Sequence, residues 1–122
     1  MHTPASLSLP SGHRLPALGL GTWRMGESRA QRKHELGALR HALDMGYRLF
    51  DTAEMYAEGG AEQLLGEALA QALRGSVARE QLFVVTKVYP HNASAQGVRA
   101  ACERSRRRLQ LDLALREQRD LY

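Results

Sequence analysis

Three side chains near the middle of the sequence have the chemistry to act together on a carbonyl group. Asp51 follows the apolar run Tyr47–Phe50, Tyr56 lies in the Gly-rich loop after it, and Lys87 closes a second apolar run, Leu82–Thr86. An ammonium lowers the pKa of a nearby phenol from about 10, and a carboxylate keeps that ammonium charged and oriented. Such a tyrosine is a general acid. Each residue alone has an ordinary structural explanation, so the prediction requires all three to meet.

Alternating strands and helices are needed to bring these residues together. Two extended pieces, Ser6–Leu9 and Leu15–Trp23, flank the turn signal Ser11-Gly12, which predicts a hairpin leading into a strand. Leucine and alanine at helical spacing predict three helices, and the apolar runs between them predict buried strands. We place the helices at about residues 28–45, 61–74 and 95–109.

Cap residues mark several of these helix ends. Ser28 and Gln31 form the S-x-x-Q pattern of a capping box before the first helix, and Ser94 predicts the N-cap of the third. Gly46 and Gly75 follow the first and second helices, where a glycine commonly ends a helix.

The alternation predicts parallel strands joined by right-handed helical crossovers. Parallel strands deliver their carboxyl ends to one face of a sheet or barrel, which is where ligands bind. Asp51 and Lys87 each end a strand, and Tyr56 lies in the loop above the first of these strands. We therefore expect the three side chains to be neighbours.

Composition favours one cytoplasmic domain. In 122 residues, 17 Lys and Arg against 13 Asp and Glu give a net charge of +4, well short of the concentrated basic face of a nucleic-acid binder. The single cysteine, Cys102, cannot form an internal disulfide, and no Cys/His cluster has metal-ligand spacing. No leader pattern or stretch of ~18 apolar residues occurs. We expect a soluble protein that binds no metal, nucleic acid or membrane.

Two glycine-containing stretches fail to match phosphate-binding motifs. The segment Gly19-Leu20-Gly21 is followed by Arg24 where a dinucleotide fingerprint needs a third glycine. Gly26 is followed by Glu27, without the lysine of a Walker loop. A Rossmann or Walker site is therefore not predicted.

The remaining polar residues are assigned to solvent or core. His34 and His41 lie on the polar side of the first helix, and His91 follows Lys87 in a loop. His91 could face a substrate, but a solvent or structural role is favoured. Cys102 is expected in the core. We expect the basic cluster of the third helix to be its solvent face: Arg104 and Arg106 to Arg108.

Six stretches are informative together: GLGTWRMGE (19–27), FDTAEMY (50–56), GEAL (66–69), VVTKV (84–88), PHNAS (90–94) and ACERSRRRL (101–109). They resemble the N-terminal part of the aldo-keto reductases, and particularly the bacterial subgroup that includes methylglyoxal reductases. The resemblance covers about residues 5–112. It implies a (β/α)8 barrel preceded by a hairpin at its amino-terminal end. Because the barrel needs about 250 residues, this chain would supply the hairpin and the first three to four βα units.

The resemblance also implies NADPH-dependent reduction of small aldehydes or ketones to alcohols. Tyr56 would protonate the carbonyl oxygen while the nicotinamide delivers hydride, Lys87 would lower the pKa of Tyr56, and Asp51 would pair with Lys87. Gly21, Thr22 and Asp51 correspond to family positions that approach the cofactor. Trp23 corresponds to a position that lines the substrate pocket.

Residues after about 112 diverge from the family pattern. LQLD (109–112) continues as LALREQRDLY, without the histidine that the family carries near the end of its fourth strand. Leu111–Leu115 or Leu121-Tyr122 could supply a further strand. In the family, the pocket for the adenine and 2′-phosphate lies in the second half of the barrel, so we expect this chain alone to bind NADPH weakly or not at all.

Two function classes stay open on the sequence. The chain is the first portion of a carbonyl reductase, with Tyr56, Lys87 and Asp51 at its catalytic face. Alternatively, it is a non-catalytic fragment, produced by a frameshift or premature stop, that is inactive alone. Such a fragment would expose an open sheet edge, which favours self-association or contact with a partner.

Overall fold

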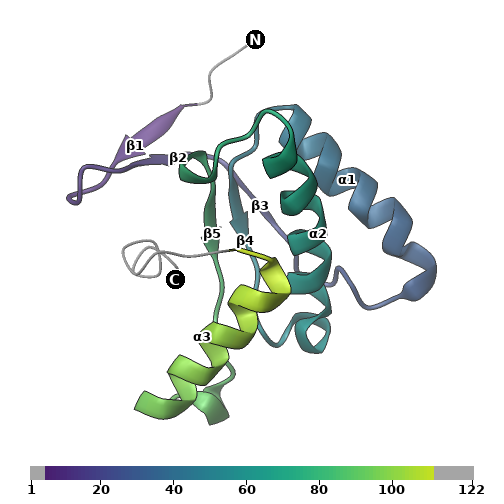
Figure 1. Cartoon of the computed structure of the whole chain (residues 1–122), viewed down its shortest axis with the longest axis vertical. Helices are drawn as coiled ribbons and strands as arrows, with labels where there is room; N and C mark the ends of the chain where they lie inside the picture. Colours follow the sequence, from purple (N-terminus) through teal and green to yellow (C-terminus); the bar gives the residue numbers. More distant parts are fainter. Residues whose placement is uncertain (1–4, 112–122) are drawn as a thin grey trace.

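The computed structural model describes residues 5–111, and its strands form two separate sheets (Figure 1). The predicted hairpin is present, but Leu15–Trp23 divides between two strands rather than forming one. Parallel pairing of the strands after the hairpin is confirmed. The antiparallel pair is β1 (Ser6–Ser8) and β2 (Arg14–Pro16), and the parallel sheet runs β3 (Gly19–Gly21), β4 (Leu49–Asp51) and β5 (Phe83–Val85).

Each strand of the parallel sheet is followed by a helix, so the described residues contain three βα units of an α/β fold. α2 contacts both α1 and α3, and it lies between them against the sheet (Figure 1). Residues expected to begin a fourth strand, Leu111–Leu115, lie almost wholly outside the described range, as does Leu121-Tyr122. The helices are α1 (Arg32–Asp44), α2 (Gly60–Arg74) and α3 (Ala95–Leu109).

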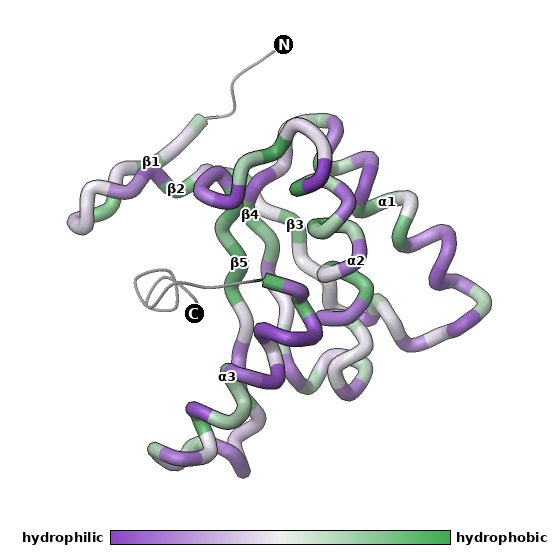
Figure 2. The backbone as a smooth tube through the Cα atoms, viewed as in Figure 1, coloured by the Kyte–Doolittle hydropathy of each residue, from purple (hydrophilic) through white to green (hydrophobic). Residues whose placement is uncertain are grey.

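Leucines of the helices and the middle residues of the strands form the core. The tube representation shows the hydrophobic run of β5 beside β4, with α2 packed close by (Figure 2). Each fully buried large apolar side chain contributes roughly 1.5–3 kcal/mol by leaving water. This packing fixes the positions of the carboxyl ends of β4 and β5, which lie at the same edge of the sheet. The fully or almost fully buried residues include Leu39, Phe50, Leu64, Leu65, Leu69, Val84, Leu109 and Leu111.

Three of the predicted helix ends are confirmed. Gly46 has a left-handed φ of 102°, Gly75 is the C-cap of α2, and the Ser94 hydroxyl accepts a hydrogen bond from the Gly97 N–H at 3.0 Å. The prediction of a capping box at Ser28 is wrong. The Gln31 N–H donates to the Ser28 backbone carbonyl at 3.1 Å, so a 3₁₀ turn precedes α1 and the Ser28 side chain makes no capping bond.

No helix within residues 5–111 has the length and apolar character needed to cross a lipid bilayer.

Candidate active site

Asp51 and Lys87 meet at the carboxyl ends of two neighbouring strands. Asp51 is the last residue of β4 and pairs in register with Gly21 and Val85, while Lys87 lies just beyond β5. The Lys87 ammonium donates to Asp51 Oδ1 at 2.8 Å and to the Thr52 carbonyl oxygen at 2.9 Å. The side chains of Lys87 and Asp51 are 44% and 46% exposed, so this ion pair faces solvent.

Tyr56 completes this group, which we call the rim triad: Asp51, Tyr56 and Lys87. The Lys87 Nζ lies 5.3 Å from the centroid of the Tyr56 ring, within the range of a cation–π contact. Tyr56 is half-buried and begins the 3₁₀ turn η2 (Tyr56–Gly59). The structure therefore brings together the three side chains that the sequence pointed to; their catalytic roles stay a prediction.

Three residues at the end of β3 lie beside the triad. Thr22 is fully buried, and its N–H and hydroxyl both donate to the Asp51 carbonyl oxygen at 3.0 Å. Gly21 is exposed, and no atom lies within 4 Å of the point where a Cβ would stand. Trp23 is 72% exposed, with the Arg24 guanidinium 5.9 Å from its ring centroid. Thr22 thus holds the backbone of Asp51, while Gly21 and Trp23 are open to a ligand.

The turn that carries Tyr56 has an unusual backbone. Ala57 and Glu58 both have φ of 53°, and Gly59 has φ of 90°, so left-handed residues follow Tyr56 in succession. A left-handed conformation costs a non-glycine residue roughly 1–2 kcal/mol, so surrounding contacts must maintain it. On the other side of Tyr56, the Glu54 N–H donates to the Lys87 carbonyl oxygen at 2.9 Å.

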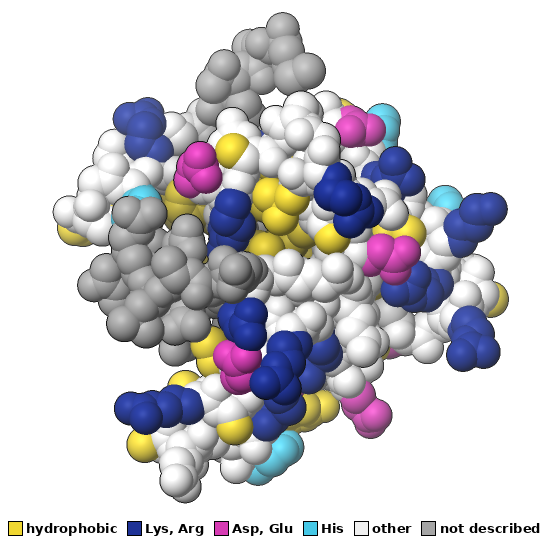
Figure 3. Space-filling view, in the orientation of Figure 1, with side chains coloured by type: hydrophobic (Ala, Val, Ile, Leu, Met, Phe, Trp, Pro, Cys, Tyr) yellow, Lys and Arg dark blue, Asp and Glu magenta, His cyan; other side chains and the backbone are white. Residues whose placement is uncertain are grey.

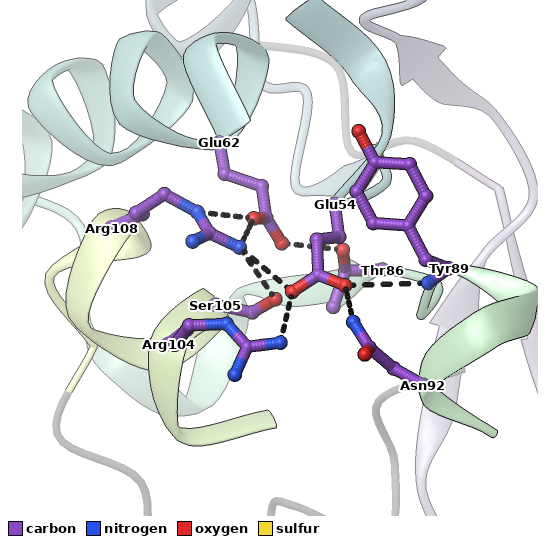
Figure 4. Close-up of polar contacts among 8 residues, drawn as sticks. All are labelled: Glu54, Glu62, Thr86, Tyr89, Asn92, Arg104, Ser105 and Arg108. Carbon is purple, nitrogen blue, oxygen red and sulfur yellow. Dashed lines mark hydrogen bonds and ion pairs between the residues drawn. The ribbon is translucent and has the colours of Figure 1, made fainter. Parts of the chain in front are cut away.

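Glu54 is a buried carboxylate with hydrogen bonds to both of its oxygens (Figure 4). Oε1 accepts from the Tyr89 N–H at 3.3 Å and from Asn92 Nδ2 at 3.0 Å. Oε2 accepts from Arg104 at 3.0 Å and from Arg108 at 3.4 Å. Burial raises the pKa of Glu54, but the bonds from Tyr89, Asn92 and Arg104 outweigh burial and hold this pKa below its ordinary value.

Glu62 of α2 is a second buried carboxylate and is fully inaccessible. Its Oε1 accepts from Arg108 Nε at 2.7 Å, and its Oε2 accepts from the Thr86 hydroxyl at 2.6 Å. Arg108 therefore lies between the two buried carboxylates (Figure 4). We call the two buried carboxylates, Glu54 and Glu62, together with their partners Arg104 and Arg108, the buried charge cluster.

The expectation that the arginines of α3 form a solvent face is wrong for Arg106 and Arg108. The Arg108 side chain is 19% exposed, because it reaches both buried carboxylates, whereas Arg104 bonds Glu54 and stays 45% exposed. Arg106 is 26% exposed and bonds Glu103 and the Leu111 carbonyl oxygen. Arg107, at 73% exposed, and Arg104 fit the expectation. Basic side chains gather over α3 in Figure 3.

The other singled-out residues lie outside both groups. His34, His41 and His91 are exposed, and the His91 ring stacks on Tyr89 with centroids 4.7 Å apart. Cys102, expected in the core, is only half-buried, and this burial raises the pKa of its thiol. Within residues 5–111, no group of three His, Cys, Asp or Glu side chains is placed to hold a metal ion.

Comparisons with known proteins agree on one family. The model of the Aldo/keto reductase family matches residues 17–114. Methylglyoxal reductase YeaE of Escherichia coli is 54% identical over 98 residues, which make up 80% of this chain and 32% of the relative. NADP-dependent D-sorbitol-6-phosphate dehydrogenase of Malus domestica is 39% identical, over 88% of this chain and 32% of the relative.

Solved structures give the same result. A Klebsiella pneumoniae aldo/keto reductase in complex with NADP and acetate superposes with a TM-score of 0.75 at 45% identity, covering 90% of this chain and 37% of that one. A Bombyx mori aldo-keto reductase in complex with NADP gives 0.79 at 31% identity, covering 92% and 36%. The chain thus spans about a third of the length of its relatives, and its βα units are those of their barrel. It belongs to the aldo/keto reductase family.

Proposed function

We propose that this chain supplies the proton-donating side of an NADPH-dependent site that reduces an aldehyde or ketone to an alcohol. The observation that carries the proposal is the position of Lys87, which contacts both Asp51 and Tyr56 at one sheet edge. Several relatives are named for NADPH-dependent reduction or for reduction of methylglyoxal, which agrees with a small carbonyl substrate.

In this mechanism, the Tyr56 hydroxyl holds the proton that passes to the carbonyl oxygen. The Lys87 ammonium stabilises the negative charge that the phenol gains as its proton leaves. Asp51 and the Thr52 carbonyl oxygen fix that ammonium in place, because each accepts a hydrogen bond from it. Thr22 in turn fixes Asp51 through two bonds to its carbonyl oxygen.

The residues at the end of β3 fit a flat cofactor ring. Gly21 is the register partner of Asp51, and the space over its Cα is open, so a planar group could lie against the backbone there. NADPH bound in this place supplies hydride. Gly21 and Asp51 would line the nicotinamide end, with buried Thr22 holding Asp51 from behind, and exposed Trp23 would line the substrate pocket.

A chimera tests the proposal most directly. The matching 98 residues of the Escherichia coli methylglyoxal reductase are replaced by those of this chain, and NADPH oxidation by methylglyoxal is followed. We expect turnover, and we expect Tyr56→Phe to lower kcat by roughly 10²–10⁴-fold. Tyr89→Phe is the matched control and should retain the activity. A folded chimera whose kcat is unaffected by Tyr56→Phe would overturn the proposal.

The 122-residue chain assayed by itself separates the two function classes left open by its sequence. It spans 32% of the Escherichia coli relative, so we expect no saturable micromolar NADPH binding and no turnover when it is alone. Sedimentation of the same sample reports whether it self-associates. Turnover by the folded chain alone would overturn the fragment alternative.

A further inference from the structure

Arg108 lies against both ends of the turn around Tyr56 and bonds to one of them. Glu54 precedes Tyr56 and accepts a hydrogen bond from Arg108 at 3.4 Å. Gly59 follows Tyr56, and a Cβ placed on it would stand 2.9 Å from both Cδ and Nε of Arg108. Gly59 also needs its φ of 90°, so glycine is required there for conformation and for space. The Arg108 side chain therefore lies against the turn on either side of the tyrosine.

Glu54 joins this turn to the segment that carries Lys87. Its N–H donates to the Lys87 carbonyl oxygen, and its carboxylate accepts from the Tyr89 N–H and from Asn92 Nδ2. Glu54 is two residues before Tyr56 in the sequence. Its partners Tyr89 and Asn92 are two and five residues after Lys87. The strand pairing of β4 with β5 ends at Asp51 and Val85. The contacts of Glu54 therefore continue to link the two segments beyond the end of the sheet.

We propose that Glu54, bonded to Arg108, Arg104 and Asn92, is a positioning residue that sets the contact between Tyr56 and Lys87. It does not touch the rim triad through its side chain and acts through the backbone on either side. The left-handed residues Ala57 and Glu58 would otherwise relax, which would move the Tyr56 ring from the Lys87 ammonium. The role of this contact in reduction rests on the function proposed above.

The test measures the contact itself in the full 122-residue chain, without turnover. Tyrosine labelled with ¹³C at Cζ gives four resonances, and Tyr56→Phe identifies the one from Tyr56. Lys87→Met should shift this resonance and defines the position without the contact. We expect Glu54→Gln to shift it towards that same position. In the Glu54→Gln background, we also expect Lys87→Met to have a smaller effect than in the unmodified chain.

Glu58→Gln is the matched control, because Glu58 is an exposed carboxylate of the same turn. It should leave the Tyr56 resonance in place. If Glu54→Gln does not fold by circular dichroism, Asn92→Ala decides, since it removes one donor to Oε1 and keeps every charge. It should give a smaller shift in the same direction. A Tyr56 resonance unmoved in the folded variant overturns the proposal, whether or not the chimera is active.

Discussion

The rim triad and the buried charge cluster use the same kinds of side chain in opposite ways. Asp51 is 46% exposed, and its partner Lys87 is 44% exposed. Glu62 and Glu54, by contrast, are 0% and 5% exposed, and both oxygens of each accept hydrogen bonds. An accessible pair can lie beside a bound ligand, whereas an enclosed, fully bonded carboxylate holds elements together. Accessibility and hydrogen-bond count, more than residue type, distinguish the proposed catalytic group from the supporting one.

Arg108→Met should have the largest effect on stability. It leaves the carboxylate of Glu62 buried with Thr86 as its remaining hydrogen-bond partner, and breaking a buried ion pair costs roughly 3–5 kcal/mol. Urea denaturation measures the change. Arg107→Met is the control: Arg107 is 73% exposed and pairs with Glu103 at the surface, so its loss should cost at most about 1 kcal/mol. Equal effects for the two variants would contradict the comparison.

Gly66→Ala should come next, because α3 crosses α2 at this glycine. A Cβ on Gly66 would lie 2.8 Å from Leu109 Cα, and it would also meet the Arg108 carbonyl oxygen. We expect a loss of about 1–3 kcal/mol from overpacking. Gly37→Ala on α1 is the control, since nothing lies near its Cβ position, and it should gain about 0.5–1 kcal/mol. A stabilising Gly66→Ala would show that α3 can move away from α2 at little cost.

The rim triad could be predicted from the sequence because it follows from topology. Apolar runs identified β4 and β5, and parallel pairing then required Asp51 and Lys87 to share an edge. The Gly46, Gly75 and Ser94 helix ends were equally readable, because each depends on a local backbone requirement. The failed capping box at Ser28 shows the limit of such patterns, since a backbone bond from Gln31 to the Ser28 carbonyl formed a tight turn instead.

The buried charge cluster was not predicted from the sequence, because charged side chains were expected to be exposed to solvent. Glu62 lies on the same face of α2 as Leu65 and Leu69, and Arg108 is adjacent to buried Leu109 on α3. Opposite charges on the apolar faces of two helices that pack together are a signal of a buried pair. Their pairing across 46 residues depends on how α2 and α3 pack, which the sequence pattern alone does not specify.

The acid dependence of stability should distinguish Glu54 from an exposed carboxylate. Its folded pKa lies below its ordinary value of 4.5, so its contribution is fully present above that pH. The contribution is then lost as the pH falls through the folded pKa. We expect the free energy of unfolding, measured in urea from neutral to acid pH, to fall more steeply below about pH 4.5 for the unmodified chain than for Glu54→Gln. Parallel profiles would contradict a charged Glu54 as a source of stability.

Asp51→Asn should have the smallest effect on stability, although Asp51 belongs to the proposed catalytic group. Exposed ion pairs typically contribute about 0–1 kcal/mol, and salt screens them further. We therefore expect a loss within that range in urea, smaller still at high salt, while the chimera loses activity because Lys87 is no longer held by a carboxylate. A loss comparable to that of Arg108→Met would mean that the rim pair supports the fold. The contrast between an accessible rim triad and a stabilising buried charge cluster would then not hold for Asp51.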